Sequence, residues 1–169
     1  MTQRNFEIAL AKGEVGEMVV RRHLERKGWI VYKPHTEGAH AFDILAIFKK
    51  RTAIAIDVKS KSRMNKFPAT GIEQRHFEEY RAFSEKHRMP FWVVFVDESQ
   101  RTVYGNALSA LEVPRFVSGT QYPFIMQTTR STLHLWPLDA MKHIANLDDE
   151  SASQLTSLSQ RNYTYEVAA

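Results

Sequence analysis

The chain has 169 residues, of which 43% are apolar and 25% are charged, the composition of an ordinary globular domain. No apolar run reaches the roughly 18 residues that a membrane-spanning helix needs, so we expect no contact with a membrane. Cysteine is absent, which excludes disulfides and thiolate metal sites. Together with an N-terminus that lacks an apolar leader, this favours a cytoplasmic protein. Any metal ion would have to bind oxygen or imidazole ligands.

Positive charge is concentrated in the first half of the chain. Residues 1–90 contain 18 lysines and arginines against 11 acidic residues, whereas residues 91–169 contain 5 against 8. Lysine and arginine neutralise phosphates, so this asymmetry suggests that a polyanion contacts the first half, although a solvated basic face is the simpler interpretation. The candidate nucleic-acid contacts are Lys49, Lys50, Arg51, Lys61, Arg63 and Lys66.

The first predicted element is an amphipathic helix over residues 5–27. Residues of one face (the stripe) recur at spacings of three and four, which is typical of an amphipathic helix. Gly28 follows as a typical C-terminal stop of the helix. Glu17 is a carboxylate on the face that should be buried, and Gly16 beside it leaves space around that carboxylate. The stripe consists of Phe6, Leu10, Gly13, Glu17, Val20 and Leu24.

Three strands are predicted next, over residues 29–33, 41–48 and 53–59. Asp43 is the polar exception in the second strand, and Asp57 and Lys59 share one face of the third because side chains alternate along a strand.

The register of the second and third strands has a checkable consequence. Directly opposed residues of an antiparallel pair point to the same face. Asp43 and Asp57 therefore share a face only if opposed positions add to an even number such as 100, which places Ile47 opposite Ala53. This register requires an odd-length loop around residues 49–51, or a bulge in one strand.

The remaining elements complete a mixed α/β pattern. Residues 62–70 read as a polar loop, after which Thr70 and Glu73 match a capping box that opens a helix to about His87. Strands are predicted over 91–96, 102–108 and 133–136, and a helix over 138–147. We expect a single domain over residues 1–147 with its core in 5–108, and a poorly ordered Ser/Asp-rich tail over 148–169.

Four charged residues fall where the pattern favours apolar or neutral ones: Glu17, Asp43, Asp57 and Lys59. Buried charges are costly unless they are paired or bind a metal. Converging carboxylates suit Mg²⁺, or Mn²⁺ in its place, and such an ion activates water against a phosphodiester. A neighbouring lysine can orient that water and stabilise the developing charge. Taken singly, each residue also fits a simple ion pair or a strand end.

These residues resemble the PD-(D/E)xK nuclease superfamily, which includes restriction enzymes and archaeal Holliday-junction resolvases. The resemblance lies in Asp43 and the Asp57-Val58-Lys59 segment on two adjacent apolar strands, after a helix that contains Glu17. It implies a restriction-endonuclease-like core, in which a central mixed β-sheet is flanked by helices in the order α-β-β-β-α-β.

The resemblance also implies roles for individual residues. The metal ligands would be the carboxylates of Glu17, Asp43 and Asp57 and the backbone carbonyl of Val58, with Lys59 as the catalytic lysine. Some relatives place a polar residue at the start of the following helix. Gln74 is the candidate for that position, with Arg75 and His76 as competitors. Two departures are Phe42 in place of the family's proline and Asp57 in place of the commoner glutamate.

The sequence therefore predicts a magnesium-dependent endonuclease that hydrolyses DNA in preference to RNA. A homodimer is expected, because a DNA junction presents two equivalent strands. One alternative is a non-catalytic nucleic-acid-binding module on the same fold. Another is an interaction protein whose acidic C-terminal half docks a partner.

Overall fold

The computed structural model describes residues 3–34, 41–49, 51–65, 67–129 and 131–166. Its helices are α1 (Gln3–Arg26), α2 (Gln74–His87), α3 (Leu108–Leu111), η1 (Leu138–Ala140, a 3-10 turn) and α4 (Asp149–Glu166). Its strands are β1 (Trp29–Tyr32), β2 (Ile44–Phe48), β3 (Thr52–Ser60), β4 (Ala69–Glu73), β5 (Phe91–Asp97), β6 (Thr102–Ala107), β7 (Arg115–Val117), β8 (Thr120–Tyr122), β9 (Phe124–Gln127), β10 (Thr132–Pro137) and β11 (Lys142–Asn146).

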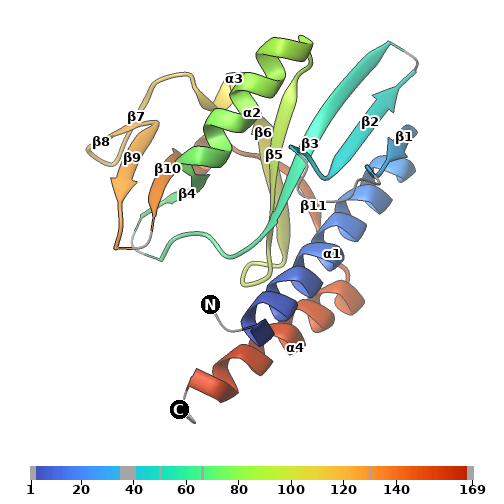
Figure 1. The fold of residues 1–169 in the computed structure, drawn as a ribbon, viewed down its shortest axis with the longest axis vertical. Helices are drawn as coiled ribbons and strands as arrows, with labels where there is room; N and C mark the ends of the chain where they lie inside the picture. The colour runs from blue at the N-terminus through green and yellow to red at the C-terminus, as the bar shows by residue number, and fades with distance from the viewer. Residues whose placement is uncertain (1–2, 35–40, 50, 66, 130, 167–169) are drawn as a thin grey trace.

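A six-stranded mixed sheet forms the centre, in the order β1-β2-β3-β5-β6-β11 (Figure 1). The pair β3–β5 is parallel and its neighbours are antiparallel. Helices α1 and α4 pack on one face, where Ile56 and Val58 join their core. Helix α2 packs on the other face against Ala55. The predicted mixed sheet flanked by helices is confirmed.

The predicted register of β2 and β3 is confirmed. Ile47 lies opposite Ala53, and three residues separate Phe48 from its partner Thr52. Just before β2, the Asp43 amide donates a hydrogen bond to the Ile56 carbonyl over 2.9 Å. This bond is one residue out of the register of the ladder, which begins with Ile44 opposite Ile56. Asp43 therefore lies just before the start of β2, beside the part of β3 that contains Asp57 and Val58.

Helix α1 begins and ends close to the predicted limits, but its apolar stripe is only partly buried. Gly28 follows it with a φ of +82°, a conformation that glycine adopts without strain. Val20 is buried, whereas Phe6 and Leu10 are 59% and 56% exposed. The reason is that the first turns of α1 project beyond the strand ends, beside α4 (Figure 1). Gly16 permits close approach to β3, because a Cβ there would meet the Ser60 hydroxyl at 2.1 Å.

Two sequence predictions in the middle of the chain are wrong. Thr70 and Glu73 do not form a capping box: they belong to β4, and α2 begins only at Gln74, with no side-chain cap. The backbone of 69–73 instead pairs with β10 in a second sheet, ordered β4-β10-β9. Residues 138–147 do not form a helix either, because 142–146 pair with β6 as β11.

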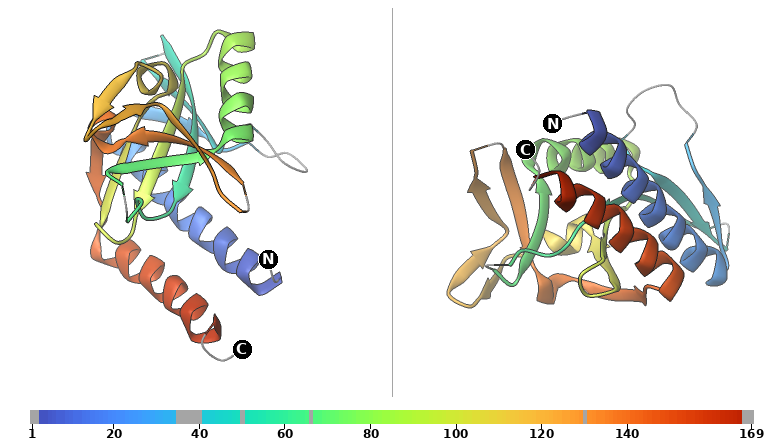
Figure 2. Two further views of the ribbon diagram at one scale, coloured as in Figure 1. Left: turned by 90° about the vertical axis from the view of Figure 1, so that its left-hand side faces the viewer. Right: turned by 90° about the horizontal axis from the view of Figure 1, so that it is seen from below.

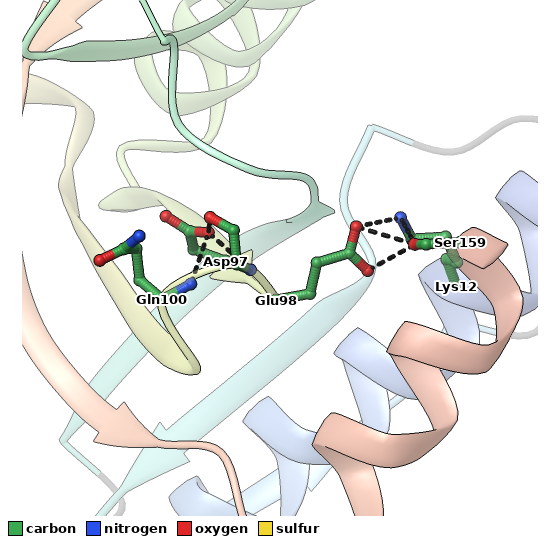
Figure 3. Close-up of polar contacts among 6 residues, drawn as sticks. Lys12, Asp97, Glu98, Gln100 and Ser159 are labelled. Carbon is green, nitrogen blue, oxygen red and sulfur yellow. Dashed lines mark hydrogen bonds and ion pairs between the residues drawn. The ribbon is translucent and has the colours of Figure 1, made fainter. Parts of the chain in front are cut away.

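The expected disordered tail is also wrong for residues 149–166, which form α4. Leu155 is fully buried and Ala152 nearly so, three residues apart on the face that meets α1. Figure 2 shows α1 and α4 side by side in both views. A polar bridge joins them to the β5–β6 turn: Glu98 accepts hydrogen bonds from Lys12 Nζ at 2.7 Å and from Ser159 Oγ at 2.9 Å (Figure 3).

In the part of the chain that the structure describes, no helix has the length and apolar character needed to cross a bilayer.

Candidate functional site

Asp43 and Asp57 form an acidic pair beside the central strands. Asp43 Oδ2 accepts a hydrogen bond from the Val58 amide over 2.7 Å, which fixes its carboxylate against β3. Burial, followed by the negative charge of Asp57, raises the pKa of Asp43 to about 6. The two acids therefore lie close enough to repel each other, and a cation between them would relieve that repulsion.

Asp57 is only 4% exposed, and its polar neighbours include Lys59 and Tyr80. Its Oδ1 lies 2.9 Å from the ammonium nitrogen of Lys59. Its Oδ2 is buried without a well-aligned donor, although the Tyr80 phenol lies near the carboxylate. A buried carboxylate oxygen that is poorly hydrogen-bonded is costly. This oxygen and the neighbouring Asp43 carboxylate fit the hard oxygen ligands that Mg²⁺ prefers.

Glu17 approaches this pair from α1 but is bound elsewhere. Its Oε2 lies 2.8 Å from Lys33 Nζ, and hydrogen bonding to Glu17 raises the pKa of Lys33. The charge of Glu17 also contributes to the raised pKa of Asp43, which places it within electrostatic reach. Among the described residues, no three acidic or histidine side chains already stand together as a metal site. The structure thus brings Asp43, Asp57 and Lys59 together and leaves Glu17 paired with Lys33.

Two residues of α2, Tyr80 and His76, lie within electrostatic reach of Lys59. Tyr80 is buried, and Lys59 Nζ lies 6.0 Å from the centre of its ring. Burial, and then the charge of Asp57, raises the pKa of the Tyr80 phenol above its usual range. One helical turn earlier, His76 stacks on Tyr80, and burial followed by the positive charge of Lys59 lowers its pKa. The sequence indicates His76 as a competitor for the polar position at the start of this helix, whereas Tyr80 is missed, because an aromatic residue on an amphipathic helix is typical of core packing.

Gln74 lies in a different polar network. Its Oε1 is 2.9 Å from His134 Nδ1, and its Nε2 donates to Glu78. The opposite ring nitrogen of His134 is 3.1 Å from Glu112, which also accepts a hydrogen bond from the Trp136 indole. Among the three candidates for the start of α2, Gln74 belongs to this network and Arg75 pairs with Glu73. His76 is the one whose pKa is lowered by burial and then by the charge of Lys59.

The predicted phosphate contacts divide into two groups. Lys61 and Arg63 have internal partners. The Lys61 ammonium donates to the Gly71 carbonyl, and burial, followed by the charge of Lys59, lowers its pKa to about 8. Arg63 Nε lies 2.7 Å from the buried carboxylate of Asp97, whose other contacts are drawn in Figure 3.

The second group lies at the β2–β3 turn, where Lys49 and Arg51 are exposed. Lys50 and Lys66 lie outside the described residues. Lys49 and Arg51 can therefore contact phosphate from the solvent side. Lys61 and Arg63 instead hold the segment after β3 in place through their internal partners.

Comparisons with known proteins identify the fold. No protein-family model and no curated protein matches the sequence. A solved structure of Hjc, a Holliday junction resolvase from Archaeoglobus fulgidus, matches with a TM-score of 0.51 and 16% identity, covering 76% of this chain and 90% of that one. The chain has the fold of a nuclease.

A second similar structure is D212, a nuclease from a fusselovirus. It matches with a TM-score of 0.49 and 13% identity and covers 94% of this chain and 97% of its own. The predicted fold class, a central mixed sheet flanked by helices, is confirmed by the match to the resolvase structure.

Proposed function

We propose that the protein is a divalent-metal-dependent endonuclease that hydrolyses phosphodiester bonds in DNA. The observation that carries this proposal is the pair of the partly buried Asp43 and the buried Asp57, with the Lys59 ammonium 2.9 Å from Asp57, on a nuclease fold. Two neighbouring carboxylates repel each other, which costs folding free energy. A bound cation commonly offsets this repulsion in proteins.

Mg²⁺ would be held by Asp43, Asp57 and the Val58 carbonyl. The amides of Ala55 and Lys61 donate toward β5, whereas the amide of Val58 donates toward Asp43. The amide and carbonyl of one strand residue point to the same side, so the Val58 carbonyl also faces Asp43, just before the start of β2. Glu17 would become a further ligand after separating from Lys33.

The ion would polarise the scissile phosphodiester and lower the pKa of a bound water. Lys59 then has its own task. Its side chain is 30% exposed while its ammonium is held by Asp57, so it can reach a phosphate in solution without losing its position. There it would orient the attacking water and stabilise the negative charge that develops on phosphorus-bound oxygen.

DNA would approach over the β2–β3 turn, where Lys49 and Arg51 face solvent. Lys50 and Lys66 are proposed as further phosphate contacts on their sequence position alone. Contacts of this type make binding fall steeply with salt. We also propose that two copies act together, because a branched substrate offers two equivalent strands and each chain supplies one acidic pair.

A non-catalytic nucleic-acid-binding module is the second candidate. The observation in its favour is the Glu17–Lys33 ion pair, which takes up the third carboxylate that the metal site would use. This alternative predicts salt-sensitive DNA binding that is indifferent to Asp57→Asn and to chelation by EDTA.

Cleavage of supercoiled plasmid, four-way-junction DNA and a matched RNA, with Mg²⁺ or EDTA, tests the proposal. Asp57→Asn and Lys59→Met should each lower the cleavage rate by about 10²-fold or more, since groups that stabilise transition-state charge are worth that much. The matched controls Asp139→Asn and Lys86→Met change exposed residues and should cleave like wild type. Equal rates in all five proteins would refute the assignment, and faster cleavage of RNA would correct the substrate.

A further inference from the structure

An apolar cleft lies between the C-terminal half of α1 and the central sheet. Its volume is about 500 Å³, within the range of sites that bind small ligands or inserted side chains. The sheet side of its lining includes the aliphatic side chains of Ile54, Ile56 and Val94. Two tryptophans, Trp29 from β1 and Trp92 from β5, line it as well. The cleft therefore offers an aliphatic and aromatic surface to an apolar group.

Both tryptophans are held by neighbours. Trp29 packs against the Phe48 ring with 5.1 Å between ring centres. Trp92 lies under the ammonium of Lys142, which is 5.8 Å from the centre of the ring. Their positions are fixed by contacts within the chain, so the cleft is formed before anything enters it.

Positive charge surrounds the opening. Lys27 and Lys142 are exposed there, and His23 and His143 stand beside them. Burial, followed by the positive charges of Lys27, Arg26 and His143, lowers the pKa of His23. None of the described residues that line the cleft is acidic. An apolar lining within a cationic opening is complementary to an apolar group that has carboxylates next to it.

The cleft and the acidic pair lie on opposite faces of the sheet. Ile54 and Ile56 of β3 point toward α1, whereas Asp57 points toward α2, because side chains alternate along the strand. A ligand in the cleft would leave the acidic pair open to DNA.

We propose that this cleft binds an acidic amphipathic peptide segment of a partner protein. One of its apolar side chains enters between Trp29 and Trp92, and its flanking carboxylates pair with Lys27 and Lys142. Nucleic acid is a poorer fit, because the aliphatic lining offers no hydrogen bonds to base edges and the cations stand only at the opening.

The three tryptophans of the chain allow a direct test by NMR of their indole N–H signals. Trp29 and Trp92 line the cleft, while Trp136 is buried in the core under α2 and serves as an internal control. The probe is the peptide acetyl-EDLFEDLF-amide, compared with acetyl-KKLFKKLF-amide and with a single-stranded oligothymidylate. We expect the acidic peptide to shift the Trp29 and Trp92 signals and to leave Trp136 in place.

Charge reversal completes the test. Lys142→Glu should weaken binding of the acidic peptide by about tenfold or more, whereas Arg115→Glu, an exposed arginine in β7, should not change it. The proposal is overturned if the acidic peptide shifts neither cleft tryptophan, if the lysine peptide or the oligothymidylate binds as well, or if Lys142→Glu has no effect. Shifts that follow protein concentration alone would assign the cleft to a second copy of the chain instead.

Discussion

The backbone amide of Val58 donates a hydrogen bond to the carboxylate of Asp43, and this 2.7 Å contact holds the acid that precedes β2 beside the strand that carries Asp57. The bond lowers the energy of the Asp43 charge, yet burial and the neighbouring acid outweigh it, since the pKa of Asp43 still rises to about 6. Without a bound cation, the pair therefore destabilises the folded chain at neutral pH.

The contribution of Asp43 to stability should fall as the pH rises from about 4 to about 6. The folded chain holds the Asp43 proton more tightly than the unfolded chain, whose carboxyl has its ordinary pKa of 3.8, so deprotonation favours unfolding. In EDTA at pH 7.5, Asp43→Asn should melt above wild type, by about 2–4 °C for each kcal/mol of charge repulsion and burial cost that the substitution removes. The difference should shrink at pH 4. A constant difference at both pH values would contradict the assignment of the raised pKa to Asp43.

Mg²⁺ should stabilise the wild-type protein against heat. A ligand that binds only the folded chain adds about 2.7 kcal/mol at a hundred times its dissociation constant. We expect thermal melts to shift upward with Mg²⁺ in wild type and in Asp139→Asn, and to stay in place in Asp57→Asn, which lacks one ligand charge. A similar shift in all three would place the ion elsewhere.

Lys33 should compete with the metal for Glu17. Exposed ion pairs are worth up to roughly 1 kcal/mol, so Lys33→Met should preserve the fold and raise Mg²⁺ affinity by up to about fivefold. Adding Glu17→Gln should abolish the gain, which a double-mutant cycle by titration calorimetry would measure. Unchanged affinity in Lys33→Met would remove Glu17 from the ligand set.

Leu155 should anchor α4 to the rest of the chain. Its side chain is fully buried against α1, and truncating such a residue typically costs about 2–5 kcal/mol. Leu155→Ala should lower the unfolding free energy in urea by that amount, whereas Thr156→Ala, at an exposed position, should change it by less than about 0.5 kcal/mol. Equal values would mean that α4 adds little to the core.

The acidic pair could be predicted because it breaks a strong local pattern. Asp43 and Asp57 interrupt runs that are otherwise apolar. The register of the two strands is enough to predict that both acids lie on the same side. The strands β2, β3 and β5 were also predictable, since their β-branched residues alternate or run continuously.

The wrong sequence predictions concern segments whose structure depends on contacts with residues far away in the sequence. Thr70 and Glu73 have the residue types of a helix start, but β10 pairs with that segment. The sequence predicts the strand over 133–136, whereas nothing local indicates that it pairs with residues 69–73. The Ser-rich composition before Leu155 is typical of a disordered tail. The segment is helical in the structure because it packs against α1. Lys61 and Arg63 looked like phosphate contacts because the Gly71 carbonyl and the Asp97 carboxylate are brought to them only by folding.

Helix α1 contains Glu17 near the acidic pair and, two turns later, Leu24 in the lining of the cleft. Seven helical residues span only about 10 Å, and the hydrogen-bonded backbone between them is stiff. Any tilt of α1 that widens the cleft must also displace Glu17. A peptide that tilted α1 on binding would thereby change the affinity of the acidic pair for an ion, and the ion would change the affinity for the peptide by the same factor, because such coupling is reciprocal.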